Sequence, residues 1–230
     1  MSTATELILS NNNLKEKDDE IELESKQYND LLTIYGLAMN QVVNTATNIK
    51  NRLNEIYNYN LIEKIDCRVK SKGSILRKMD KKDIPFTYQA MVKYVDDIAG
   101  VRIICPLQDD VLLVKEVIKN MPNIHVIQEK DYITTPKKSG YSAYHLIVET
   151  PLTINTETVI MKVEIQIRTV AMDFWAEMEH DIRYKNKTNK QLTKTESKKL
   201  TWYAKKLEKL QEKMVRLYRK QEDNTTMVNY

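Results

Sequence analysis

VIMKVEIQIR, residues 159–168, alternates between apolar and polar side chains and therefore predicts a β-strand with one buried face. Its odd-numbered residues are all apolar, whereas Lys162, Glu164, Gln166 and Arg168 follow one another on the even-numbered side. Because successive side chains of a strand point to opposite faces, one face should pack in the core and the other should carry a carboxylate, an amide and two cations. For this strand taken alone, an ordinary solvated face is the simpler interpretation.

The flanking sequence predicts further strands with helices between them. Strands are expected at residues 65–69, 98–105, 124–133 and 144–149, the last joined to the 159–168 strand by a connection at 151–157. Helices are expected at residues 20–59, 74–82, 111–120, 169–184 and 193–220. Ser74 and Asp109 are the expected N-caps of two helices, and Gly100 is expected to mark a bulge or a close approach of backbone. The pattern predicts an α+β fold, with a mixed, mostly antiparallel sheet between long N- and C-terminal helices.

The two ends of the chain differ in pattern from its middle. We expect a flexible arm at residues 1–19, an amphipathic helix at 20–59, a folded core at 60–190 and a helical extension at 191–230. Apolar residues of the extension are spaced by 3, 4, 3, 4 and 3 positions, at Leu200, Tyr203, Leu207, Leu210, Met214 and Leu217. Such a short heptad seam fits packing within the chain and pairing with another subunit equally well.

The composition is that of a chain that can fold around one core. Its 230 residues include 36 Lys and Arg and 32 Asp and Glu, a net charge of +4, which is too small for coating nucleic acid by charge alone. The two cysteines, Cys67 and Cys105, rule out a disulfide framework and a four-thiolate zinc site. With no apolar run of membrane-spanning length and no signal peptide in the sequence, we expect a soluble, cytoplasmic protein.

Two carboxylates are expected to share a basic pocket. Arg68 and Lys70 share one face of their predicted strand, and Arg102 lies on the next strand. If these faces coincide with the polar face of Glu164, several cations surround that carboxylate, and Asp97 stands just before the strand of Arg102. Carboxylates bind Mg²⁺ and cations bind phosphate oxygens, so the combination suggests a divalent ion that holds a polyphosphate. A structural ion-pair network is the alternative that periodicity leaves open.

A lysine-rich segment precedes the 144–149 strand. TTPKKSG, residues 134–140, has the composition of a loop and is followed by Tyr141. Aromatic side chains beside Lys137 and Lys138 could stack on a base and bind its phosphates. The same residues also fit a loop that serves only solubility.

Four blocks of sequence follow one another between about residues 68 and 185. They are Arg68-Val-Lys with Ser74-Ile-Leu, DDIAGVRIIC (96–105), DYITTPKKSGYSAYH (131–145) and VEIQIRTVAMDFWAEMEH (163–180). Together they resemble the synthetase domain of the RelA/SpoT-type guanosine polyphosphate enzymes, in the short form called small alarmone synthetases. The resemblance implies a nucleotidyltransferase-like core that transfers the β,γ-pyrophosphate of ATP to the 3′-hydroxyl of GDP or GTP. The products would be AMP and ppGpp or pppGpp, the signals of the stringent response.

The same resemblance implies roles for individual residues. Asp97 and Glu164 would be catalytic and would hold Mg²⁺, and Glu164 would also accept the proton of the attacking hydroxyl. The ATP-binding residues would be Arg68, Lys70, Ser74, Lys78, Lys81 and Arg102, with the two arginines stacked on the adenine. The residues that bind GDP or GTP would be Lys137, Tyr141, His145, Gln166 and Asp173, with Tyr141 stacked on the guanine.

The resemblance also bears on partners and on alternatives. Small members of the family commonly form homotetramers through terminal helices, so a homo-oligomer is expected, whereas a ribosome-binding domain is not. His180-Asp181 spells the dipeptide of metal-dependent phosphohydrolases, but it has no companion histidines at ligand spacing, so we expect no hydrolase activity. The main alternative is an inactive module on the same fold that binds nucleotides or RNA. The presence of both Asp97 and Glu164 argues against it, because a pure binder gains nothing from metal ligands.

Overall fold

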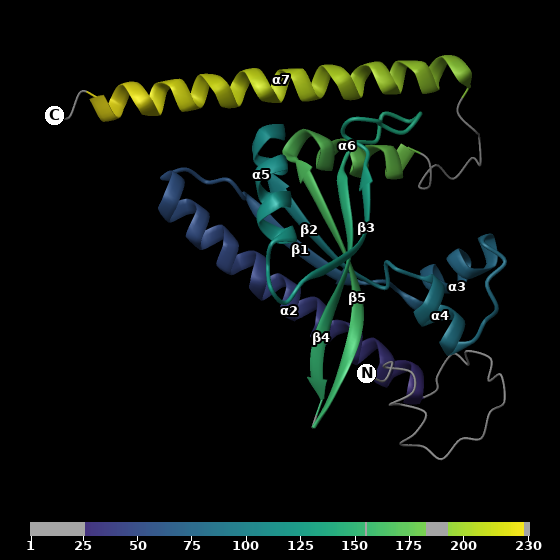
Figure 1. The fold of residues 1–230 in the computed structure, drawn as a ribbon. Helices are drawn as coiled ribbons and strands as arrows, with labels where there is room; N and C mark the ends of the chain where they lie inside the picture. Colours follow the sequence, from purple (N-terminus) through teal and green to yellow (C-terminus); the bar gives the residue numbers. More distant parts are fainter. Residues whose placement is uncertain (1–25, 155, 183–192, 228–230) are drawn as a thin grey trace.

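The computed structural model describes residues 26–154, 156–182 and 193–227 and is built around a five-stranded sheet (Figure 1). Its strands are β1 (Lys64–Val69), β2 (Ala99–Cys105), β3 (His125–Asp131), β4 (Tyr144–Ile154) and β5 (Glu157–Thr169). They lie in the order β1-β2-β5-β4-β3, in which β2 and β5 are parallel and the other neighbours are antiparallel. The prediction of an α+β fold with a mixed, mostly antiparallel sheet is confirmed.

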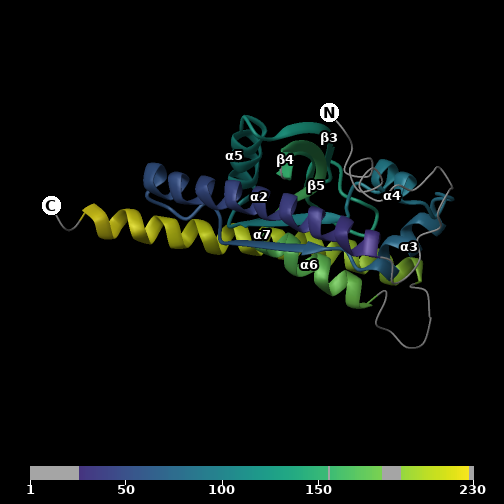
Figure 2. The same cartoon turned by 90° about the horizontal axis from the view of Figure 1, so that it is seen from below.

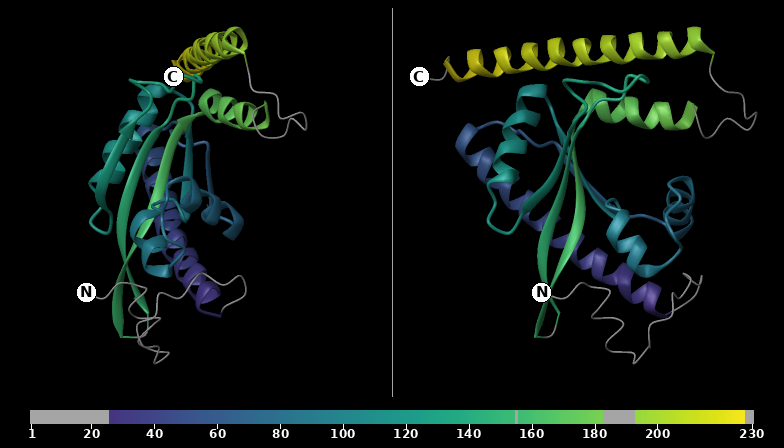
Figure 3. Two further views of the ribbon diagram at one scale, coloured as in Figure 1. Left: turned by 90° about the vertical axis from the view of Figure 1, so that its right-hand side faces the viewer. Right: turned by 45° about the vertical axis from the view of Figure 1, so that its right-hand side comes forward.

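Helices cover one face of this sheet and one of its ends. They are α2 (Lys26–Tyr57), α3 (Lys72–Lys81), α4 (Tyr88–Tyr94), α5 (Gln108–Lys119), α6 (Val170–His180) and α7 (Lys194–Met227). The long helix α2 runs obliquely across the sheet, as the view from below shows (Figure 2). Helices α6 and α7 lie against each other at the end where β5 terminates (Figure 3).

The alternation of β5 separates its side chains into a core face and a polar face, as predicted. Val163, Ile165 and Ile167 are buried in the same apolar cluster as Leu31 and Val42 of α2. Burying one such side chain contributes roughly 1.5–3 kcal/mol, so the register of β5 is strongly fixed by its apolar face. The polar face is thereby directed to the side of the sheet away from α2.

The predicted N-caps of two helices were wrong. Helix α3 begins after Ser71, so Ser74 lies in its first turn, and helix α5 begins after Leu107 rather than after Asp109. At α5 the reason is the next acidic residue: the Asp110 carboxylate accepts a 2.9 Å hydrogen bond from the backbone N–H of Leu107. This bond binds a donor that the start of a helix would otherwise leave free.

The connection between β4 and β5 is shorter than predicted. Residues 151–157 are not a loop, because β4 continues through Pro151, which pairs with Ile160, and ends at Ile154. The pairing of β3 with β4 stops at Glu149, so β4 is an edge strand beyond that point. A proline at an edge costs no ladder hydrogen bond, which is why the strand tolerates Pro151.

One helix was missed, and some predictions lie outside the described residues. Helix α4 is short, and Thr87 caps it by accepting a 3.2 Å hydrogen bond from the backbone N–H of Ala90. The arm at 1–19, the start of the 20–59 helix and the end of the 169–184 helix fall outside the described ranges. The division into four regions stays a prediction.

None of the helices in the described ranges has the length and apolar character that crossing a membrane requires.

Candidate active site

A cavity of about 380 Å³ opens on the polar face of the sheet, where β1, β2 and β5 lie side by side. Its lining consists of Asp66, Cys67, Arg68, Lys70, Asp97, Gly100, Val101, Arg102, Glu164, Gln166 and Glu177. The strand register explains this gathering, because Gly100 of β2 is paired with both Arg68 and Glu164. Since glycine has no side chain, the floor between the arginine and the glutamate stays open.

Asp97 reaches the cavity from a turn and not from the strand. The ladders of β2 with β1 and with β5 run regularly through Gly100, so the expected bulge is absent. Asp97 lies two residues before β2, in the turn that follows α4, where the strand's alternation does not constrain it. Asp97 and Arg102 are an odd number of residues apart, which in one regular strand would place them on opposite faces. Because Asp97 lies in the turn, both can still line the cavity.

Two lysines neutralise the Asp97 carboxylate. Lys70 Nζ donates a 2.5 Å hydrogen bond to Oδ2, and Lys78 Nζ of α3 lies 2.7 Å from Oδ1. Burial raises the pKa of Asp97, but the hydrogen bonds and charges of the two lysines outweigh it, so the pKa lies below its ordinary value. Asp97 is thus an ionised carboxylate held between the ammonium groups of Lys70 and Lys78.

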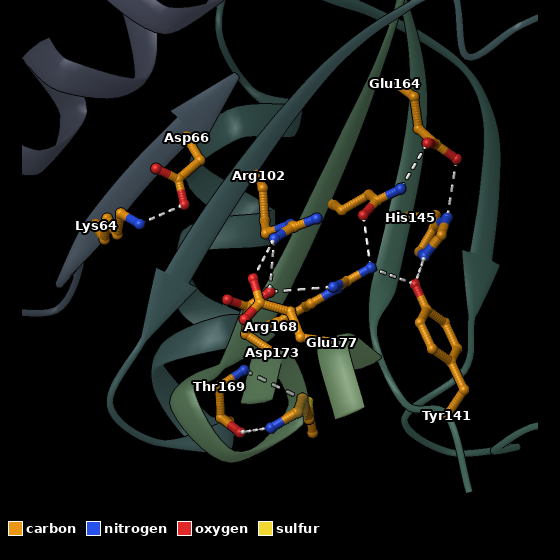
Figure 4. Close-up of polar contacts among 12 residues, drawn as sticks. Lys64, Asp66, Arg102, Tyr141, His145, Glu164, Arg168, Thr169, Asp173 and Glu177 are labelled. Carbon is orange, nitrogen blue, oxygen red and sulfur yellow. Dashed lines mark hydrogen bonds and ion pairs between the residues drawn. The ribbon is translucent and has the colours of Figure 1, made fainter. Parts of the chain in front are cut away.

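Glu164 is held by two donors from its own face of the sheet. Its Oε1 is 2.9 Å from His145 Nδ1, and its Oε2 accepts a 2.7 Å hydrogen bond from Gln166 Nε2 (Figure 4). Burial and the nearby charge of Asp97 raise the pKa of Glu164. The hydrogen bonds from His145 and Gln166 and the charge of His145 lower the pKa by more than this. The net shift is downward, so Glu164 is a carboxylate at neutral pH.

The two carboxylates can serve a divalent cation. Asp97 and Glu164 line one cavity and are close enough for the charge of one to affect the pKa of the other. Asp97 Oδ1 is buried and, within the described residues, has no well-aligned hydrogen bond despite its ion pair with Lys78. No group of three or more His, Cys, Asp or Glu side chains in those residues forms a complete cage. This set fits Mg²⁺, which takes one or two carboxylates and fills its other positions with water and phosphate oxygens.

Of the remaining residues predicted to bind ATP, two line the cavity and two do not. Arg68 and Arg102 both line the cavity, and Arg102 is paired with Asp173 at 3.1 Å and with Glu177 at 3.6 Å. Ser74 and Lys81, both on α3, are not among the lining residues: Ser74 accepts a 3.0 Å hydrogen bond from Arg77, and Lys81 is exposed at the end of the helix.

The residues predicted to bind GDP or GTP form a second group beside the cavity. Tyr141 OH is 2.7 Å from His145 Nε2, and Lys137 Nζ lies 4.6 Å from the centre of the Tyr141 ring. Burial lowers the pKa of Lys137 and raises that of Tyr141. Gln166 connects the two groups. It lines the cavity, and its amide contacts Glu164, which is also in contact with His145 of the second group. Asp173 lies on α6, which follows β5 directly.

Sequence reasoning did not assign some residues that the structure places at the site. Arg168 is buried and contacts Gln166, Tyr141 and Asp173. Its place in the β5 alternation was a signal for it. Glu177 lies one helical turn after Asp173, which is a spacing that could have been noticed. Tyr132, whose ring is 4.5 Å from Lys137 Nζ, gave no such signal.

Comparison with known proteins found a matching family and relatives that cover most of the chain. A family model described as a region found in RelA / SpoT proteins matches residues 67–189. The GTP pyrophosphokinase YwaC of Bacillus subtilis is 40% identical over 177 residues, covering 76% of this chain and 84% of the relative. YjbM, a GTP pyrophosphokinase of the same organism, is 38% identical over 168 residues, covering 73% of this chain and 78% of the relative.

Solved structures of small alarmone synthetases are similar to this chain in fold and sequence. The small alarmone synthetase 1 from Bacillus subtilis bound to its product pppGpp has a TM-score of 0.76 and 34% identity, covering 85% of this chain and 98% of that one. The small alarmone synthetase 2 from the same organism has a TM-score of 0.74 and 35% identity, covering 85% of this chain and all (100%) of that one.

Proposed function

The chain belongs to the RelA/SpoT family, and from that premise we propose that it is a (p)ppGpp synthetase. It transfers the β,γ-pyrophosphate of ATP to the 3′-hydroxyl of GDP or GTP and releases AMP. The observation that carries the proposal is the single cavity that holds Asp97 and Glu164 together with Arg68, Lys70 and Arg102.

The donor nucleotide fits the β1–β2 side of this cavity. Arg68 and Arg102 offer planar guanidinium groups that can stack on either side of an adenine. Lys70 and Lys78, which form ion pairs with Asp97, can bind phosphate oxygens once a cation takes over the carboxylate. Ser74 and Lys81 would bind the outer phosphates from α3, which carries Lys78 as well.

Asp97 and Glu164 would hold Mg²⁺, which neutralises phosphate charge when bound. Glu164 also receives the proton. The 3′-oxygen of the acceptor forms a bond to the β-phosphorus of ATP, the bond from that phosphorus to the α-bridging oxygen breaks, and AMP leaves. The depressed pKa of Glu164 keeps it ionised and available as the acceptor of the hydroxyl proton.

The acceptor nucleotide fits the β4–β5 side. Tyr141 offers a ring for stacking on the guanine, and Lys137 beside it offers a cation for the 5′-phosphates. His145, Gln166 and Asp173 complete this side. The carboxylate of Asp173 only accepts hydrogen bonds, which suits the N1–H and N2–H donors of a guanine edge.

The test is product identification. Incubation of the protein with ATP, GDP and Mg²⁺ should yield AMP and ppGpp in equal amounts by ion-exchange chromatography, and omission of Mg²⁺ should abolish both. Absence of AMP release with GDP and with GTP would refute the proposal. Nucleotide binding in calorimetry without any turnover would instead favour the inactive binding module.

We further propose that the enzyme is a homo-oligomer that acts in the cytoplasm, where ATP and GDP are available. The support for an oligomer comes from the α7 seam. Leu200 and Leu207 face α6 across an apolar groove that also includes Phe174, whereas Met214 and Leu217 are exposed. An exposed apolar continuation of a heptad seam suits a second copy of the same helix.

A further inference from the structure

Arg168 is a buried cation to which the proposed reaction has so far given no role. It is only 4% exposed, near the end of β5, although arginine is rarely buried without partners. Removing a cation from water is costly unless hydrogen bonds and opposite charges compensate for it. The partners of Arg168 therefore indicate what its burial accomplishes.

Those partners form a closed ring of hydrogen bonds with the proposed catalytic base (Figure 4). Arg168 donates to Gln166 Oε1 at 2.6 Å, and Gln166 donates to Glu164 Oε2 at 2.7 Å. On the other side Arg168 donates to Tyr141 OH at 2.7 Å, and Tyr141 OH is 2.7 Å from His145 Nε2. His145 Nδ1 closes the ring at 2.9 Å from Glu164 Oε1.

The guanidinium fixes the direction of its own two bonds in this ring and of the bond from Gln166 to Glu164. Because arginine can only donate, the oxygen of the Gln166 amide must face it, and the amide nitrogen is left for Glu164. Tyr141 accepts from Arg168, and because the ionised Glu164 can only accept, His145 Nδ1 donates to it. Both oxygens of Glu164 consequently accept, which stabilises its ionised form.

A second set of contacts connects the ring to both nucleotide sides. Arg168 NH1 donates to Asp173 Oδ1 at 3.1 Å, and the same oxygen is 3.1 Å from Arg102 NH1. The guanidinium carbon also lies 5.1 Å from the centre of the Tyr141 ring, within the range of a cation–π contact. One side chain thus sets the position of the acceptor aromatic, of Asp173 and of the amide that contacts the base.

We propose that Arg168 is a positioning residue that locks the acceptor-binding Tyr141 and the base Glu164 into one arrangement. The inference rests on the proposed synthetase function. It assigns to Arg168 an effect on the binding of the acceptor nucleotide and on the orientation of the Glu164 carboxylate, without contact to the reacting atoms.

The test is Arg168→Lys, which keeps the charge but lacks the fork needed to bond Gln166, Tyr141 and Asp173 at once. We expect the KM for GDP to rise about tenfold, whereas the KM for ATP changes less than about threefold. The kcat should also fall by about tenfold, because a free Gln166 amide no longer holds the Glu164 carboxylate in one orientation. Arg219→Lys is the matched control: Arg219 bonds Asp110 at 2.8 and 3.0 Å outside the site, so both KM values and kcat should stay unchanged.

Tyr141→Phe provides a second variant that leaves the buried guanidinium in place if Arg168→Lys fails to fold. It removes the hydroxyl that links Arg168 to His145, and the KM for GDP should again rise more than the KM for ATP. Equal KM values for GDP in that variant and in wild type would overturn the inference, as would equal increases in both KM values in Arg168→Lys. Wild type is measured in the same assay. If wild type produces no ppGpp, the proposed function fails, and calorimetric titration of GDP into wild type and Arg168→Lys then decides this inference, with unchanged affinity refuting it.

Discussion

Asp97 and Glu164 both have pKa values below the ordinary range despite their burial, and the causes differ. Asp97 is stabilised by two ammonium groups that substrate phosphates can take over. Glu164 is stabilised by His145 and Gln166, which stay with the protein when nucleotides bind. This difference suits a carboxylate that exchanges cations and a carboxylate that must keep one orientation to accept a proton.

Glu164→Gln should preserve the fold and reduce turnover by roughly 10²–10⁴-fold, because the proton acceptor and a metal ligand are lost together. The measurement is the rate of AMP release from ATP and GDP, with thermal unfolding as a check on folding. Glu149→Gln is a suitable control, since Glu149 is a half-buried carboxylate of β4 that does not line the cavity. Near-normal turnover in Glu164→Gln would contradict its assignment as the base.

At the scale of elements, α7 lies over the loop that carries Lys137 and Tyr141, which we propose bind the acceptor nucleotide. Thr201 of α7 donates a 3.0 Å hydrogen bond to the backbone carbonyl of Lys138. Gly140 has a φ of +88°, and a Cβ there would lie 2.9 Å from Ala204 Cβ and 3.2 Å from Thr201 Cα. The loop can therefore approach α7 only with glycine at this position.

Gly140→Ala should lower the free energy of unfolding by about 1–3 kcal/mol, because alanine is strained at positive φ and clashes with α7. Displacement of the loop should also raise the KM for GDP more than the KM for ATP, since Lys137 and Tyr141 flank this glycine. Gly73→Ala is the matched control: its new Cβ would be 3.4 Å from a flexible Arg77 side chain, and its φ is not in the strained region. Equal effects of the two variants on the acceptor KM would contradict the role of α7.

Helix α7 also contacts the start of α6. The Glu208 carboxylate is 3.1 and 3.2 Å from the hydroxyl of Thr169, the N-cap of α6, and Gln211 accepts a 2.5 Å hydrogen bond from the backbone N–H of Ala171. Burial raises the pKa of Glu208 to about 7, reinforced by the charge of Glu212 and opposed by the Thr169 hydrogen bond. The contact between the helices therefore depends on pH near neutrality.

The sign of this dependence follows from proton binding. A carboxyl whose pKa is raised on folding binds its proton more tightly in the folded state, so the free energy of unfolding falls as pH rises from its ordinary value toward about 7. Glu208→Gln should therefore increase the free energy of unfolding by on the order of 1 kcal/mol at about pH 8 and change little at about pH 5. Urea unfolding at the two pH values checks this, with the exposed Glu55→Gln of α2 as control. A difference of the same size at both pH values would contradict it.

At the scale of the whole molecule, the two faces of the sheet differ in chemistry, one apolar and the other polar. Helix α2 seals one face with apolar contacts, and the other face holds the polar cavity. Apolar side chains along the seam of α7 remain exposed, with Leu210, Met214 and Leu217 at 55%, 61% and 65%. A contiguous exposed seam of this kind is typical of an interface rather than of a monomer surface.

The double variant Leu210→Glu/Met214→Glu should reduce the mass measured by size-exclusion chromatography with light scattering, because charges would be buried in the proposed interface. Helical content should be retained, since both positions are exposed within one chain. The double variant Lys209→Glu/Lys213→Glu, on exposed neighbouring positions, controls for added acidic residues. Equal masses for wild type and the apolar variant would contradict the assignment of this seam as the interface.

The local pattern of the sequence was sufficient for the strands, for the polar face of β5 and for the family of the chain. Alternation is a property of a few neighbouring residues, so β5 could be divided into its two faces before any partner strand was known. The resemblance then named Asp97 and Glu164 together. The structure places both on one cavity, although Asp97 reaches it from a turn and not from a strand.

Only the tertiary structure decided the partners of buried polar groups. The ring through Arg168, the pairing of Asp173 with two arginines, and the contact of α7 with Gly140 join segments up to about seventy residues apart. The continuation of β4 through Pro151 likewise depends on where β3 stops. Local periodicity carries no information about such contacts, because they follow from strand register and helix packing, which the whole chain sets at once.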